Sequence, residues 1–352
     1  MQPSRRAFLS GRKPAPSAWE AFCRRLGGAG DGEFKLSEDD RGPGRARFAP
    51  AGHGDMALAV SLAREYGVVL ALMGDEGIVA APPDDRPAVY VDPVRLDSLA
   101  PVFAASADAR EVSGAQTVPV AWDVQPGCPL GALADAGLTQ FAGAPRHRTL
   151  AHWLAAPHPG LTPGGTGETG IVAVEVLLAD GTFEALGPFG ADATQPLQSA
   201  TVQALVPALF QAASSAEGQA CRALERWPLA YRLDALQPRA PHGVNLGQML
   251  LGHGGTLAWM CRVRLVVMPA PGGTSVPDDR ATVASDDAAV ARAESVAGTG
   301  HSIVSRDAAA FEASRRLTRR IKAAFDPGDL FPMPGQALQQ VKIPPLFSHT
   351  PP

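Results

Sequence analysis

The hydrophobic positions in the first third of the chain predict alternating strands and helices. Residues 46–51 read as a short strand, and residues 55–66 as a helix that ends at Gly67. Residues 68–73 form a continuous apolar run, which is typical of a parallel strand buried on both faces. A further strand is predicted over residues 88–92. This region therefore reads as a β-α-β unit with one added strand.

The later part of the chain mixes half-buried strands with helices. The strand predicted over residues 172–178 leads into Asp180-Gly181, a strong signal for a hairpin turn. Further strands are predicted at 118–124 and 257–268, and helices at 129–136, 195–212, 244–251 and 307–325. No G-x-G-x-x-G motif follows a strand, so the pattern does not predict a dinucleotide fold of that type.

The N-terminal region combines an export-like motif with a normal helix start. Ser17 and Glu20 have the spacing of a capping box, so a helix is predicted to begin after Ser17, and residues 28–44 read as a connector rich in Gly and Asp. Residues 4–9, SRRAFL, resemble a twin-arginine export signal, but the apolar stretch that such a signal needs does not follow. We therefore expect a cytoplasmic protein, with export as the alternative.

Composition excludes several functional classes. The 352 residues are 45% apolar and 19% charged, enough for two or three packed units of an ordinary globular protein. A net charge of −4 gives no electrostatic case for binding nucleic acid, and no apolar run is long enough to span a membrane. The four cysteines are far apart in sequence, so no metal site is predicted.

Five segments carry motif-like sequences in a fixed order. They are residues 48–74, ending in a glycine turn; 123–133, DVQPGCPLGAL; 149–182, a glycine-rich loop with an LADGT hairpin; 245–258, NLGQMLLGHGGTLA; and 320–327, RIKAAFDP. In this order they resemble the PCMH-type FAD-binding domain of the vanillyl-alcohol oxidase superfamily. The similarity is greatest to the FAD-binding subunit of bacterial glycolate oxidase and covers about residues 46–335.

The resemblance implies an α+β fold with two FAD-binding subdomains, a vestigial cap and a C-terminal helix. The implied divisions are 1–44 for the tail, first helix and connector, 45–110 for the first subdomain, 111–270 for the second, 271–304 for the cap or linker, and 305–352 for the C-terminal helix and proline-rich tail. The interval between the last strand and the C-terminal helix is far shorter than the cap of related enzymes, which covers the flavin.

The resemblance also implies a chemistry and a set of site residues. FAD would lie between the subdomains and accept a hydride from a 2-hydroxy acid, and the electrons would leave through partner subunits, a second flavoprotein and an iron–sulfur protein. His301, in the segment GTGHS, is the candidate catalytic residue. The candidate cofactor-binding positions are Gly74, Gly77, Thr149, Gly164, Gly165 and Gly255, because glycine turns let backbone N–H groups approach a phosphate.

Three departures from the family pattern keep a second interpretation open. Asp75 and Glu76 stand in the turn that would hold the pyrophosphate, where each carboxylate would cost roughly 1–3 kcal/mol. His152 replaces a family glycine, and Pro157 and Pro159 remove N–H donors from the loop that follows. The alternative to a flavin-dependent subunit is therefore a non-catalytic relative that keeps the fold as a scaffold or partner-binding subunit.

Overall fold

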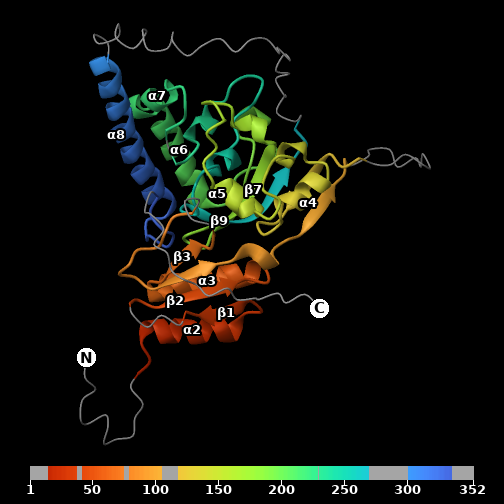
Figure 1. Cartoon of the computed structure of the whole chain (residues 1–352), viewed down its shortest axis with the longest axis vertical. Coiled ribbons are helices and arrows are strands. Elements are labelled where there is room, and N and C mark those ends of the chain that lie inside the picture. The colour runs from red at the N-terminus through yellow and green to blue at the C-terminus, as the bar shows by residue number, and fades with distance from the viewer. Residues whose placement is uncertain are drawn as a thin grey trace, which may run out of the picture.

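Two β-sheets and the helices around them make up the protein (Figure 1). The computed structural model describes residues 15–37, 42–74, 79–104, 118–228, 230–268 and 300–334, with side chains of the last range from residue 312 onwards. The predicted α+β class, with two subdomains and a C-terminal helix, is confirmed. None of the helices in the described ranges combines the length and apolar character needed to cross a membrane.

The first subdomain is built on a four-stranded sheet. Its elements are α2 (Ala18–Ala29), β1 (Glu33–Leu36), β2 (Arg45–Ala49), α3 (His53–Tyr66), β3 (Val69–Leu72) and β4 (Ala88–Val91), with strand order β1-β2-β4-β3. Strands β2 and β3 both pair in parallel with β4, as the predicted β-α-β unit requires, and β1 is antiparallel to β2. The capping box of Ser17 and Glu20 is confirmed, and Gly67 ends α3 in the left-handed conformation.

The second subdomain is built on an antiparallel sheet of five strands. These are β5 (Leu99–Val102), β6 (Ala121–Val124), β7 (Ile171–Leu178), β8 (Phe183–Leu186) and β9 (Ala258–Leu265), in the order β5-β6-β9-β7-β8. The predicted hairpin joins β7 to β8, where Gly181 has φ of +89° and Asp180 accepts a hydrogen bond from the backbone of Thr182.

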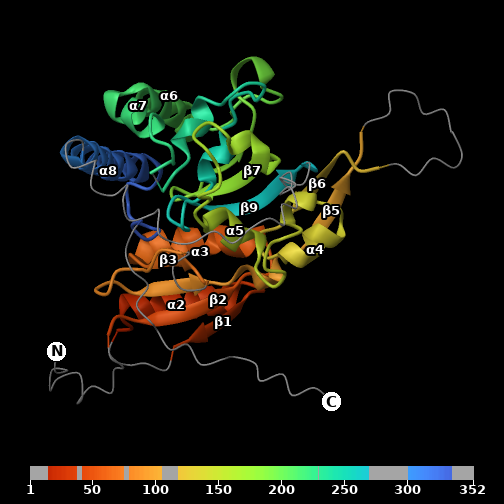
Figure 2. The same ribbon diagram turned by 45° about the horizontal axis from the view of Figure 1, so that its top comes forward.

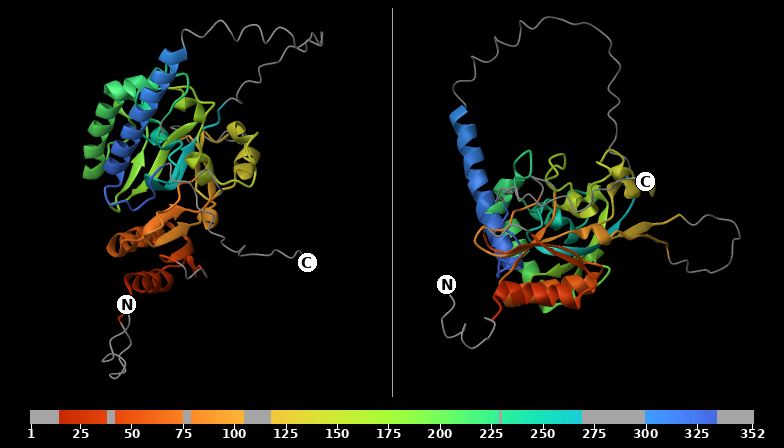
Figure 3. Two further views of the ribbon diagram at one scale, coloured as in Figure 1. Left: turned by 60° about the vertical axis from the view of Figure 1, so that its left-hand side comes forward. Right: turned by 60° about the horizontal axis from the view of Figure 1, so that its bottom comes forward.

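Helices cover the second sheet and join the subdomains. They are α4 (Leu130–Asp135), α5 (Leu150–Ala155), α6 (Ala200–Ser214), α7 (Ala216–Arg222) and α8 (Gly300–Phe325), with short 3-10 turns at Pro93–Arg95, Thr139–Phe141, Thr166–Thr169, Gly190–Asp192, Leu233–Leu236 and Gly247–Leu250. Helices α6, α7 and α8 lie side by side (Figure 3). Helix α8 begins seven residues before the predicted start at residue 307.

The second sheet lies between helices α6 and α8 on one side and the first subdomain on the other (Figure 2), and each side contains a hydrophobic core. One face packs against α6 and α8, through side chains such as Leu209 and Leu317. Part of the other face, including Leu177 and Trp259, belongs to the core of the first subdomain. The subdomains are therefore joined by continuous apolar packing, and α5 contributes to both cores.

Candidate cofactor site

The turn after β3 is the first place where the resemblance puts the FAD pyrophosphate, and a histidine covers it. The imidazole of His152 lies so close to Gly74 that a Cβ atom added there would be 2.5 Å from Nε2. Nε2 is 2.7 Å from the carbonyl oxygen of Met73, and Nδ1 is 2.8 Å from the hydroxyl of Thr149. Two of the predicted cofactor residues, Gly74 and Thr149, are thus brought together around His152: Thr149 hydrogen-bonds to its ring, and Gly74 packs against the ring.

The glycine turn of residues 252–255 is the second predicted contact, and it packs directly on the first subdomain. Gly255 has φ of +74°, and a Cβ atom added there would be 3.0 Å from Cβ of Leu72. The carbonyl of Gly254 accepts a hydrogen bond of 2.9 Å from the backbone N–H of Ala80. The cavity beside this contact has a volume of about 10 Å³, room for about one water molecule.

Gly164 and Gly165 are the third predicted cofactor contact. Their backbone N–H groups already donate hydrogen bonds to other residues of the chain. Gly164 has φ of +79°, and its N–H donates a hydrogen bond of 2.7 Å to the carboxylate of Asp234. The N–H of Gly165 donates to the carbonyl of Thr162. The side chain of Asp234 thus holds the position that an anionic ligand of this turn would take.

A buried ion pair fixes that carboxylate. Arg232 donates two hydrogen bonds to Asp234, of 2.9 Å from Nε and 2.7 Å from Nη2, and its guanidinium also donates to the carbonyls of Leu161 and Thr162. The side chains of Arg232 and Asp234 are 5% and 0% exposed. The arginine therefore ties the glycine loop to residues 232–234, and every acceptor in the arrangement belongs to this chain.

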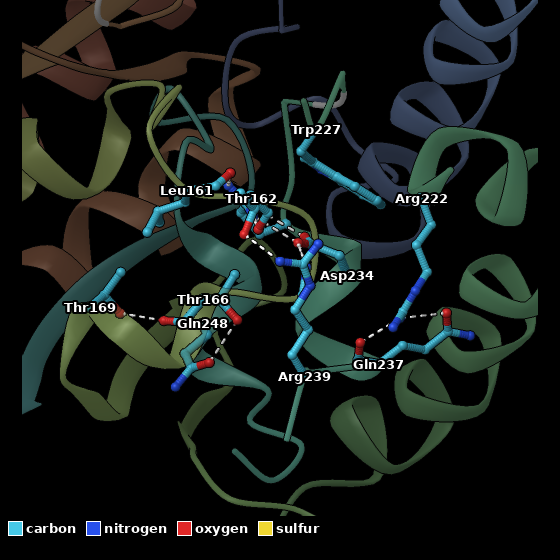
Figure 4. Close-up of polar contacts among 12 residues, drawn as sticks. Leu161, Thr162, Thr166, Thr169, Arg222, Trp227, Asp234, Gln237, Arg239 and Gln248 are labelled. Carbon is cyan, nitrogen blue, oxygen red and sulfur yellow. Dashed lines mark hydrogen bonds and ion pairs between the residues drawn. The ribbon is translucent and has the colours of Figure 1, made fainter. Parts of the chain in front are cut away.

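The same loop needs glycine for a packing reason. A Cβ atom at Gly164 would be 3.1 Å from Cγ of Arg239, and one at Gly167 would be 2.3 Å from the ring of His242. Arg239 also donates to the hydroxyl of Thr162 (Figure 4). These glycines therefore make room for other side chains of the same chain, Arg239 and His242.

Two buried polar groups lack partners at the interface between the subdomains. Both ring nitrogens of His253 are buried without a hydrogen-bond partner among the described residues. The same is true of Nε1 of Trp259. Both residues line the small cavity beside Gly255. Burial lowers the pKa of His253 to about 4, so its imidazole is neutral at pH 7.

The neutral, buried state of His253 predicts a loss of stability in mild acid. The unfolded chain binds a proton near pH 6.5, whereas the folded chain resists it down to about pH 4, so the free energy of unfolding should fall as pH decreases through this window. The expected loss is about 3 kcal/mol for this group alone.

Urea unfolding between pH 7.5 and pH 4.5 measures this loss. His253→Ser, which removes the titrating group, should flatten the dependence on pH, and His147→Ser at an exposed position should leave it unchanged. His158, whose pKa burial also lowers to about 4, and His53, whose pKa burial also lowers, contribute to the part that remains. Equal slopes for the wild type and His253→Ser would contradict the assignment.

Several candidate residues lie outside the described parts of the chain. Gly77, Asp75 and Glu76 are among them, and so is the side chain of His301, whose backbone lies in the first turn of α8. The vestigial cap predicted over 271–304 falls almost entirely there as well. Within the described ranges, no group of three His, Cys, Asp or Glu side chains is arranged to hold a metal ion.

The described residues do not fit FAD in this arrangement. A dinucleotide needs a cleft of several hundred Å³ with free backbone donors for its pyrophosphate. Here the turn at Gly74 is covered by His152, the donor of Gly164 is bound to Asp234, and the turn at Gly255 lies against Leu72. Sequence reasoning missed Asp234 and Arg232, and the motif R-x-D opposite a glycine loop is a signal that could have suggested them.

Comparison with known proteins finds similar solved structures of low identity and low TM-score. No protein-family model matches the sequence, and no curated protein matches it. Similar solved structures include an alkyldihydroxyacetonephosphate synthase, 18% identical over 63% of this chain and 31% of that chain, with a TM-score of 0.35. A 4-ethylphenol oxidase from Gulosibacter chungangensis is 13% identical over 73% and 44%, with a TM-score of 0.41.

A third similar structure is a glucooligosaccharide oxidase from Acremonium strictum that carries a 6-S-cysteinyl, 8α-N1-histidyl FAD. It is 14% identical over 70% of this chain and 42% of that chain, with a TM-score of 0.37. The chain thus spans less than half the length of each of these proteins. TM-scores this low do not indicate a shared function. The function is therefore inferred from the residues of the chain itself.

Proposed function

We propose that this protein is a non-catalytic relative of the FAD-linked oxidases, which keeps the two-subdomain shell as a scaffold or partner-binding subunit. The observation that carries the proposal is the engagement of the predicted phosphate-binding backbone by the chain's own side chains, Asp234 at Gly164 and His152 at Gly74. Displacing a buried, ion-paired carboxylate to admit a second anion would cost several kcal/mol, which weakens any flavin affinity.

An exposed apolar surface supports the partner-binding role. Phe103, Val118, Val120 and Val267 are 48–78% exposed, and they lie at the ends of β5, β6 and β9 that meet in the second sheet. Large exposed apolar patches often mark interaction surfaces, and these four side chains project from one end of the sheet. In this proposal the fold holds that surface in place, and the apolar packing between the subdomains stabilises the fold.

The absorption spectrum of the purified full-length chain tests the proposal. We expect no flavin bands, either as purified or after incubation with excess FAD and removal of free ligand, and no turnover of glycolate or D-lactate with a dye acceptor. Calorimetric titration with FAD controls for loss of cofactor during purification. About one flavin per chain, retained after filtration, would overturn the proposal.

A second candidate function is an FAD-binding subunit of the glycolate oxidase or D-lactate dehydrogenase type, acting on a 2-hydroxy acid within a complex of redox subunits. The unpartnered polar atoms of His253 and Trp259 favour it, because buried polar groups normally have partners and these two line the subdomain interface. The resemblance of residues 320–327 to the family motif also favours it. Retained flavin in the same experiment would select this candidate.

A further inference from the structure

A groove on the second sheet is separate from the small cavity at the interface between the subdomains. His53 of the first subdomain lies near its Arg262 and Glu175, whose charges act on the imidazole. It has a volume of about 140 Å³, more than ten times that of the cavity beside Gly255, and the two share no lining residue. The small side chains of Ala173 and Ala185, on β7 and β8, form part of its lining, and the segment after β8 adds Phe189 and Leu197. The groove is thus formed by the second subdomain alone.

Two ion pairs join neighbouring strands in this groove. One is hydrogen-bonded, and the other is not. Arg264 on β9 and Asp123 on β6 form a two-pronged pair with both hydrogen bonds at 2.8 Å. Arg262 on β9 and Glu175 on β7 are also direct cross-strand partners, but their nearest charged atoms are 3.6 Å apart, too far for a hydrogen bond. Their side chains are 40% and 29% exposed.

The loose pair offers opposite charges side by side to a ligand. A guanidinium binds a carboxylate through two parallel N–H groups, and a carboxylate accepts hydrogen bonds from an ammonium group. Arg262 and Glu175 can therefore engage both ends of a zwitterion, while Phe189 and Leu197 provide an apolar wall for its side chain. A diacid would meet repulsion from Glu175, and a simple amine would meet repulsion from Arg262.

We propose that this groove binds a free α-amino acid with an apolar side chain, through its carboxylate at Arg262 and its ammonium group at Glu175. The groove shares no lining residue with the cavity beside Gly255, so amino-acid binding there can be tested whether or not the chain holds a flavin. A partly exposed cross-strand ion pair contributes little to stability, so either residue can be replaced without unfolding the protein.

Calorimetric titration of the full-length chain with L-leucine tests the proposal. Isocaproate, which is leucine without the amine, and isopentylamine, which is leucine without the carboxylate, should each bind at least about tenfold more weakly, because each loses one charge-assisted hydrogen-bonded contact. Absence of leucine binding at millimolar concentration, or equally tight binding of isocaproate, would overturn the proposal.

Variants separate the two contacts. Arg262→Gln should weaken leucine binding at least about tenfold, whereas Arg316→Gln, at an ion-paired and comparably exposed position on α8, should leave it unchanged. Glu175→Gln should weaken leucine binding while preserving or strengthening the binding of isocaproate, because the repulsive carboxylate is removed. Leucine binding that is unaffected by Arg262→Gln would place the ligand elsewhere and refute the site.

Discussion

Replacing Lys322 with methionine is expected to lower the free energy of unfolding by about 3–5 kcal/mol. The ammonium group of Lys322 is buried and ion-paired to Asp326, and it donates hydrogen bonds of 2.8 Å and 3.0 Å to the carbonyls of Thr256 and Phe331. Methionine keeps most of the apolar length of the lysine side chain, so the change in stability measures the contribution of the charged ammonium group. It leaves the carboxylate of Asp326 buried without its cation.

The position of this pair explains the size of the effect. Lys322 ties α8 to the glycine turn of the second subdomain, and Asp326 accepts hydrogen bonds from the backbone of Leu330 and Phe331. Leu330 in turn accepts a hydrogen bond from Leu70 in β3 of the first subdomain. The segment RIKAAFDP is therefore a structural junction of both subdomains with α8, whatever the protein binds.

Urea unfolding of three variants measures the contribution. Arg320→Gln, on the exposed side of the same helix, should change stability by less than about 1 kcal/mol. The double variant Lys322→Met, Asp326→Asn should be more stable than Lys322→Met alone, because it removes the uncompensated charge. If Lys322→Met unfolds at the same urea concentration as the wild type, the pair is not an anchor.

The sequence predicts the elements with strong local patterns and misses those that depend on distant partners. The parallel strands, the hairpin at Asp180-Gly181 and the helix after Ser17 follow from apolar runs, turn residues and a capping box. Strand β1 lies in a segment predicted to be a connector, because its four residues are fixed by pairing with β2 and carry little signal of their own.

Helix α5 is a more instructive difference. Residues 149–155 were expected to form a cofactor loop on the strength of the family resemblance, yet Leu150 and Leu154 enter one core while Ala151 and Ala155 enter the other. This spacing of four residues is a helical pattern, and Pro157 follows where the helix has ended. The helical spacing of these residues is thus visible in the sequence itself.

The glycines of the candidate site show what sequence can and cannot specify. Gly164 and Gly255 were named as cofactor contacts, and in the structure both have positive φ and lie close to other parts of the chain. A glycine indicates that something lies near its Cα atom, but it does not identify the neighbour. At Gly164 the neighbours, Asp234 and Arg239, lie about seventy residues further along the chain, and only the fold brings them there.

The carboxylate of Asp234 leads to the second large expected effect. Asp234→Ala should lower the free energy of unfolding by about 3–5 kcal/mol, because it leaves the guanidinium of Arg232 buried without an anion and the N–H of Gly164 without an acceptor. Asp135→Ala removes the same side chain from an exposed pair with Arg146 and should leave the stability nearly unchanged.

A small anion can test whether the surroundings of Asp234 form an anion site in their own right. In Asp234→Ala the N–H of Gly164 and the guanidinium of Arg232 still converge on one position, which a formate ion has the shape and charge to fill. Thermal unfolding in sodium formate should then recover part of the lost stability, whereas equal sodium chloride should not, and the wild type should respond to neither. Equal responses of the variant to both salts would mean that screening alone acts, and that these donors recognise the carboxylate only when the chain itself delivers it.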